Sequence, residues 1–129
     1  MMRLLLDTHI FLWYISGDKR LSKDNRESIR NPDNEVYFSV VSIWETIIKY
    51  QLGKLQLPQP PEIYLPLQRE RHQILSLTLD EASVAHLAQL PPIHRDPFDR
   101  MIVCQAHVHG LKIVTVDDII TQYQVQILK

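Results

Sequence analysis

The sequence predicts an α/β fold with a mainly parallel central sheet flanked by helices, and three observations support this. Short apolar runs alternate with longer helical segments along the whole chain. The first of these runs is continuously apolar, which is typical of parallel strands that are covered on both faces. The 129 residues, 45% of them hydrophobic, are enough for one stable domain, which we expect over residues 1–129.

The first strand is expected at residues 3–6, where an apolar run ends at an acidic residue. A helix follows at 8–15 and ends before Gly17, because glycine readily adopts the left-handed conformation that closes helices. A second, more polar helix is expected at 21–29, and the proline at position 32 prevents it from continuing.

The second strand is expected at 36–40 and leads into a strongly apolar helix at 41–52, which ends at Gly53. After a proline-rich turn, another helix is expected at 62–72. Pro66 lies inside this helix and predicts a break or kink, because proline cannot donate the helical hydrogen bond.

The last part of the chain continues the alternation, and prolines or a glycine mark the ends of its helices. The expected elements are a strand at 74–79, a helix at 80–90, a helix at 97–109, a strand at 111–116, a short helix after Asp117 and a strand at 125–128. In parallel sheets, ligands bind beyond the carboxyl ends of the strands. Acidic residues that follow strands are therefore candidates for a ligand-binding site.

Four acidic residues lie where apolar runs end or where predicted core helices begin. They are Asp7, Glu45, Asp99 and Asp117. A charge at the rim of a core is costly unless it is paired or binds a metal. If the fold brings these side chains together, their hard oxygen ligands would suit a divalent cation.

Simpler explanations exist for three of these acids. Asp is a preferred N-cap residue, which explains Asp7 and Asp117 equally well. Glu45 completes an S-x-x-E capping box with Ser42 if the helix begins at the next residue. If the helix begins earlier, capped by Ser39, Glu45 lies inside it on an apolar stripe and needs a partner. Four independent caps need not converge, whereas a metal site must.

Asp96 and Asp99 have different interpretations. Asp96 followed by Pro97 is a typical pair of N-cap and first helical residue, so we interpret Asp96 mainly as a cap. Asp99 lies in the first turn and shares a helical face with Ile102 and Val103. It should therefore lean toward the core, which makes it the better ligand candidate.

Polar residues close to these acids have open roles. His94 and Arg95 could contact phosphate, although such a pair in a loop is more often solvated surface. Arg100 could balance the acidic cluster, with an exposed role equally plausible. The hydroxyls of Thr8 and Thr115 could orient the carboxylates, although ordinary helix and strand roles explain them slightly better.

Aromatic and histidine residues elsewhere suggest structural roles. Trp13, Tyr14 and Trp44 are interpreted as core or interface residues rather than base-stacking platforms. His107 and His109 are two residues apart on a helix, so they point to different faces and do not form a chelating pair.

Composition excludes several classes. A single cysteine, Cys104, excludes an internal disulfide, and no Cys/His pattern resembles a zinc site. The apolar run before Asp7 is too short for a signal peptide or membrane span, so we expect a cytoplasmic protein without a membrane partner. The net charge is −1. Setting aside Asp96 and the four acids leaves 14 basic against 10 acidic residues, a balance of +4 that permits a phosphate-bearing partner.

The segments around these acids resemble the acidic motifs of the PIN domain. The matching segments are LLLDTH at 4–9, SVVSIWE at 39–45, DPFDR at 96–100 and VTVD at 114–117. They occur in the family's order over essentially the whole chain and look most like the bacterial VapC-type toxins. The family pattern places the four acids at Asp7, Glu45, Asp99 and Asp117, and Asp118 does not substitute for Asp117.

This resemblance implies a single PIN-like domain that hydrolyses single-stranded RNA with Mg²⁺ or Mn²⁺. It also implies a homodimer held inactive by a small cognate antitoxin. Our hypothesis is that Asp7 and Asp99 bind the metal directly, whereas Glu45 and Asp117 bind a second ion or orient metal-bound water. The alternatives are a non-catalytic acidic pocket that binds a basic peptide, and a DNA-directed or small-phosphoester hydrolase.

Two apolar helices predict partner surfaces. Residues 11–15 and 40–48 are apolar nearly all round, so one face of each should stay exposed and could support the homodimer. An amphipathic antitoxin segment is expected to bind beside the acidic pocket and to direct a basic side chain toward the acids. The residues expected to line this groove are Trp13, Tyr14, Trp44 and Ile48.

Overall fold

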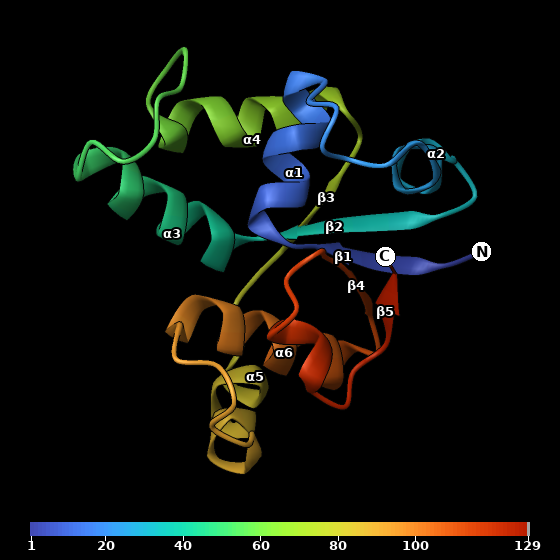
Figure 1. The fold of residues 1–129 in the computed structure, drawn as a ribbon, viewed down its shortest axis with the longest axis vertical. Helices are drawn as coiled ribbons and strands as arrows, with labels where there is room; N and C mark the ends of the chain where they lie inside the picture. Colours follow the sequence, from blue (N-terminus) through green and yellow to red (C-terminus); the bar gives the residue numbers. More distant parts are fainter. Residues whose placement is uncertain (129) are drawn as a thin grey trace.

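The structure, a computed structural model, describes residues 1–128 as one sheet with helices on both faces (Figure 1). The strands are β1 (Arg3–Leu6), β2 (Glu35–Ser39), β3 (Leu75–Leu77), β4 (Lys112–Val114) and β5 (Ile127–Leu128). The α-helices are α1 (Thr8–Ser16), α2 (Lys23–Arg30), α3 (Val40–Gln51), α4 (Pro61–Arg71), α5 (Glu81–His86) and α6 (Pro97–His109). Two short 3₁₀ helices, η1 (Leu87–Gln89) and η2 (Ile120–Gln122), follow α5 and β4.

All five strands are parallel, in the order β3-β2-β1-β4-β5. The central strand β1 pairs on both sides, and its Leu5 lies opposite Tyr37 of β2 and Ile113 of β4. The chain first builds outward through β2 and β3, then crosses to β4 on the other side of β1. Such a reversal leaves a crevice at the carboxyl ends of the strands. The predicted α/β fold is confirmed.

Alternate residues of β1 pack against the two helical layers. Leu4 and Leu6 face a cluster that contains Phe11 of α1, on the side where α1 and α4 lie in Figure 1. Leu5 faces the opposite cluster with Val103 of α6. All of these side chains are fully buried, which explains why the run at the start of the chain is continuously apolar.

Capping residues mark the ends of α1 and α6, the two helices that border the carboxyl edge of the sheet. Asp7 caps α1 and Asp96 caps α6, and each accepts a hydrogen bond from a backbone N–H of the first turn. Gly17 and Gly110 close the same two helices with φ of +67° and +65°. These left-handed conformations favour glycine. The strong terminal signals explain why α6 matches its predicted range at both ends.

Several predicted elements differ from the structure. Of the break or kink expected at Pro66, the break is wrong, because α4 continues through this residue. The helix predicted at 80–90 divides into α5 and η1. The strand predicted at 111–116 ends earlier, at Val114, and the helix after Asp117 is the 3₁₀ helix η2. Among residues 1–128, no helix combines the length and apolar character required to cross a lipid bilayer.

Candidate active site

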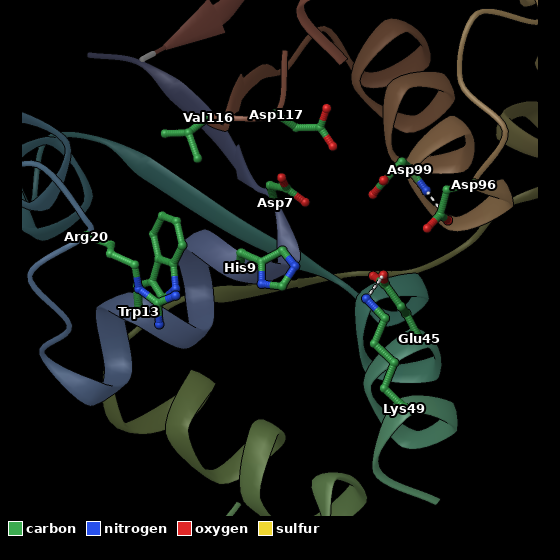
Figure 2. Close-up of a pocket in the computed structure, with 10 residues that line it drawn as sticks. All are labelled: Asp7, His9, Trp13, Arg20, Glu45, Lys49, Asp96, Asp99, Val116 and Asp117. Atoms are coloured by element: carbon green, nitrogen blue, oxygen red, sulfur yellow. Dashed lines mark hydrogen bonds and ion pairs between the residues drawn. The ribbon is translucent and has the colours of Figure 1, made fainter. Parts of the chain in front are cut away.

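A pocket of about 380 Å³ opens at the carboxyl edge of the sheet, and Figure 2 shows the side chains that line it. It brings together all four acids singled out in the sequence. The lining residues are Asp7, His9, Trp13, Arg20, Glu45, Lys49, Asp96, Asp99, Val116 and Asp117. They come from segments far apart in the chain, which fits the expectation that the acids converge. A catalytic role for each acid remains a prediction.

Asp7 follows β1 directly and is 5% exposed. One carboxylate oxygen accepts from the Thr8 N–H at 2.7 Å, as an N-cap does, and the other accepts from the Thr115 hydroxyl at 2.7 Å. Burial raises the pKa of Asp7, and these hydrogen bonds partly offset that effect. The cap and ligand interpretations of Asp7 are therefore compatible.

Glu45 lies inside α3, because Ser39 rather than Ser42 caps this helix. The capping-box interpretation is therefore wrong. The Glu45 side chain is buried, and its Oε1 accepts from the Thr8 hydroxyl at 2.8 Å. The Thr8 oxygen also lies 2.8 Å from Ser42 Oγ, so the one Thr8 proton can go to Glu45 while Ser42 donates to Thr8. Thr8 therefore orients the carboxylate of Glu45, and Thr115 orients that of Asp7. This was one of the two interpretations of these threonines.

Asp96 and Asp99 take different positions at the start of α6. Asp96 accepts from the N–H groups of Phe98 and Asp99 at 2.8 and 3.2 Å, which confirms its role as a cap. Asp99 points into the pocket (Figure 2), and its pKa is raised to about 8. Burial is the main cause, and the negative charges of Asp7, Asp96 and other pocket acids add to it. The pocket therefore carries a strong excess of negative charge.

Asp117 lies in the loop after β4 and combines two roles. Its Oδ1 accepts from the N–H groups of Ile119 and Ile120 at 2.8 and 3.3 Å, while its own N–H donates to Thr115 Oγ1. The neighbouring Asp118 is exposed and is not among the residues that line the pocket. This agrees with the choice of Asp117 over Asp118.

Three cationic or donor side chains lie in the pocket or beside its acids; Lys49 and Arg20 were not singled out in the sequence, and His94 was considered only as a phosphate contact or solvated surface. Lys49 Nζ lies 2.9 Å from Glu45 Oε2, one helical turn away, so Lys49 rather than Arg100 balances the pocket acids. Glu and Lys four residues apart on a helix were a usable signal. Arg20 stands over the Trp13 ring at 4.9 Å at the pocket rim. The third is His94.

His94 is only 11% exposed at its side chain, which excludes the solvated-surface interpretation. Its Nε2 lies 3.0 Å from Asp99 Oδ2 and 3.4 Å from Asp117 Oδ2. His94 belongs to a loop without periodicity, so no pattern in the sequence indicated that it would reach two of the four acids.

Two tight groups of potential ligands share Asp99. One joins Glu45, Asp96 and Asp99, and the other joins His94, Asp99 and Asp117, with ligand atoms within 4.8 Å of one another in each group. Asp7 lies in the same pocket but in neither group of the described residues. Carboxylate oxygens dominate, and this donor set suits a hard divalent cation. The residues present therefore fit such an ion.

The predicted groove of four residues is largely wrong. A second hollow of about 460 Å³ shares His9, Trp13 and Arg20 with the pocket, and Trp13 is the one member of the predicted set that lines it. Tyr14 packs edge-on against His72, and Trp44 packs against Phe98 of α6. The other residues lining this hollow are Leu12, Ile15, Ser16, Asp18, Leu55, Gln56, Leu57, Pro58 and Tyr64.

The sequence profile described as PIN domain matches residues 4–126. The chain belongs to the PIN domain family. This PIN domain is 29% identical to Ribonuclease VapC22 of Mycobacterium tuberculosis (strain ATCC 25618 / H37Rv) over 117 residues, which cover 91% of the chain and 88% of VapC22. It is 35% identical to Ribonuclease VapC16 of the same organism over 63 residues, 49% of the chain and 45% of VapC16. The match thus spans less than half of VapC16.

Solved structures share the architecture of this PIN domain. VapBC2 from Rickettsia felis, bound to a DNA fragment from its promoter, contains a chain with a TM-score of 0.73 and 16% identity, covering 99% of this chain and 98% of that one. VapBC-1 from nontypeable Haemophilus influenzae contains one with a TM-score of 0.68 and 21% identity at the same coverage. At these identities the likeness shows a common fold.

Proposed function

We propose that this PIN domain is a divalent-metal-dependent endoribonuclease that hydrolyses phosphodiester bonds of single-stranded RNA. The observation that carries this proposal is the convergence of Asp7, Glu45, Asp99 and Asp117 on one pocket. The relatives named ribonucleases support RNA as the substrate. The likeness to VapBC assemblies supports a role as the toxin of a toxin–antitoxin pair.

Mg²⁺ or Mn²⁺ is the ion that this pocket would take. Asp7 and Asp99 would hold it, with Glu45 and Asp117 binding a second ion or orienting water. Burial and, after it, the negative charge of the neighbouring acids raise the pKa of Asp99, and a divalent cation would relieve that charge. When bound, such an ion lowers the pKa of a bound water and offsets charge on the attacked phosphoryl group.

Residues of the chain orient the pocket acids and place positive charge near them. Thr115 fixes the Asp7 carboxylate, and Thr8 fixes that of Glu45, so the acids keep their orientation before substrate arrives. Lys49 stands beside Glu45 and Arg20 lies at the rim, where each provides a positive charge for an RNA phosphate entering an acidic pocket. Trp13 beside Arg20 offers an aromatic surface at the same rim.

The same geometry supports inhibition by a small cognate antitoxin. The second hollow is mainly apolar and continues from the acidic pocket through His9 and Trp13. An amphipathic antitoxin segment would lie in this hollow and direct a basic side chain toward the acids, where it would occupy the space needed by metal and RNA. A homodimer and a cytoplasmic location remain predictions from the family.

Digestion of matched single-stranded RNA and DNA by the purified protein tests the activity. We expect cleavage of RNA with Mg²⁺ or Mn²⁺ and none after chelation with EDTA. Preferred cleavage of DNA would support the alternative hydrolase. Absence of both metal binding and cleavage would reject the enzyme in favour of a pocket that binds a basic peptide.

A further inference from the structure

We propose that His94 is a positioning residue that holds the carboxylates of Asp99 and Asp117 next to each other, with its Nε2 between them. This inference rests on the proposed metal-dependent function and assigns a role to a side chain outside the four family acids. His94 lies between the two carboxylates, at 3.0 Å from Asp99 Oδ2 and 3.4 Å from Asp117 Oδ2.

The hydrogen bond at the other ring nitrogen determines the tautomer of His94. The backbone N–H of Asp96 donates to His94 Nδ1 at 3.1 Å. An N–H group can only donate, so Nδ1 must present its lone pair. In a neutral imidazole the proton then lies on Nε2, which makes that atom a donor to Asp117 Oδ2, with Asp99 Oδ2 also 3.0 Å from it.

This tautomer argues against His94 as a direct metal ligand. His94, Asp99 and Asp117 are close enough to form a ligand group. An imidazole binds a metal through an unprotonated nitrogen, and Nε2 is the protonated one here. Binding through Nε2 would move the proton to Nδ1, where it would face the Asp96 N–H and cost that hydrogen bond.

The loop holds the His94 ring rigidly from two sides. In addition to the bond at Nδ1, the His94 backbone N–H donates to the hydroxyl of Tyr123 at 2.7 Å. Tyr123 belongs to the buried core beside α6. The ring position is therefore set by the fold, and the ring gives the two carboxylates a fixed neighbour.

The Nε2 atom of His94 faces one oxygen of Asp99 and one oxygen of Asp117. Asp117 Oδ1 accepts from the N–H groups at the start of η2, and its Oδ2 faces His94. Asp99 also presents Oδ2 to His94, which leaves its Oδ1 for the pocket. Asp99 and Asp117 repel each other when both are ionised, and the Nε2–H group of His94 lies between their Oδ2 atoms and offsets that repulsion.

Three substitutions separate this role from a general structural one. His94→Gln keeps an N–H donor near the position of Nε2. His94→Asn keeps an acceptor near Nδ1 for the Asp96 N–H but cannot reach the carboxylates. His94→Phe keeps the ring volume and removes both the donor at Nε2 and the acceptor at Nδ1. Calorimetric titration with Mn²⁺ measures the site directly, and thermal unfolding with and without EDTA verifies the fold.

We expect His94→Asn and His94→Phe to weaken Mn²⁺ binding about 10- to 100-fold, the usual effect of removing a partner of a metal ligand. His94→Gln should stay close to the wild type. Saturating Mn²⁺ should restore much of the RNA cleavage lost in the Asn and Phe variants, because the defect lies in affinity rather than in the fold.

Other results would overturn the proposal. Unchanged Mn²⁺ affinity in folded His94→Phe would mean that His94 positions nothing. Equal losses in His94→Gln and His94→Phe would indicate a direct ligand. A wild-type protein that binds Mn²⁺ without cleaving RNA would reject the proposed function, yet the affinities would still test the role of His94.

Discussion

Two aspartate–histidine pairs lie at opposite ends of helix α6, and the pKa values of their aspartates are shifted in opposite directions. Near the helix start, His94 Nε2 is 3.0 Å from Asp99 Oδ2, and near its end, His109 Nε2 is 2.9 Å from Asp80 Oδ2. The pKa of Asp99 is raised to about 8, whereas that of Asp80 is lowered. A histidine at hydrogen-bonding distance therefore does not determine the charge state of its carboxylate.

The surroundings of the two carboxylates explain this difference. Asp80 caps α5 at the surface, and hydrogen bonds from Ser83 are the main reason that its pKa is lowered. Asp99 is largely buried and shares its pocket with other acids, including Asp7 and Asp96. Asp80 is stable as an anion, whereas Asp99 needs a proton or a cation.

Replacing Asp99 or Asp80 by asparagine should give the largest difference between the two pairs, measured as the rate of RNA cleavage. Asp99→Asn should reduce metal-dependent RNA cleavage at least about 100-fold, since loss of even an outer partner of a metal ligand costs 10- to 100-fold. Asp80→Asn is the matched control and should cleave at the wild-type rate. Initial rates at saturating Mg²⁺ measure both. Near-normal cleavage by folded Asp99→Asn would contradict the assignment of Asp99 as a ligand.

A smaller contrast should appear in the pH dependence of metal affinity. Below about pH 8 the Asp99 carboxyl of the metal-free protein holds a proton that a cation must displace. Mn²⁺ affinity should therefore rise with pH, by up to about tenfold per unit, and level off above about pH 8. Titrations in buffers with different ionisation enthalpies should reveal the released proton. Asp80→Asn should show the same profile, and a flat wild-type profile would refute the explanation.

The smallest effect concerns stability without metal. The native state keeps a proton on Asp99 that the unfolded chain loses above about pH 4. The free energy of unfolding should therefore fall as pH rises from about 4 to about 8. Asp99→Asn should flatten this decline and unfold at a higher temperature than the wild type near pH 8. Melting curves in EDTA across this pH range provide the measurement.

Asp80 should respond in the opposite direction. Its lowered pKa stabilises the fold above about pH 4, and this contribution is lost as the pH falls through the lowered value. Asp80→Asn should remove that acidic dependence and leave the decline toward pH 8 intact. If both variants changed the same pH range, the contrast between the two pairs would be wrong.

Local signals explain how much of this architecture the sequence predicts. Helix α6 is bounded by Pro97 at its start and Gly110 at its end, and its predicted range matches the structure. Asp7 and Asp117 converge because parallel strands place the residues that follow them at one edge, and Glu45 and Asp99 reach the same edge from α3 and α6. Pro66 is different, because packing of the surrounding helix overrides a strong local signal.

The residues that the sequence did not reveal depend on contacts between distant segments. His94 reaches Asp117, 23 positions along the chain, and Tyr123 supports it from 29 positions away. No periodic pattern encodes such a loop. Arg100 shows the same limit, since its place outside the pocket lining depends on how α6 packs, whereas Lys49 could have been found from its spacing to Glu45.

Asp7 and Asp96 of the pocket also serve as helix caps, and this has an evolutionary consequence. Each accepts a backbone N–H at the start of its helix, and Asp117 accepts two N–H groups in the turn that leads into η2. Asparagine caps a helix as well as aspartate does, but it lacks the charge. A single nucleotide transition converts an aspartate codon to an asparagine codon. If the pocket acts as proposed, a lineage under pressure to silence it has a one-step path at Asp7 to a protein that keeps the cap and loses the charge.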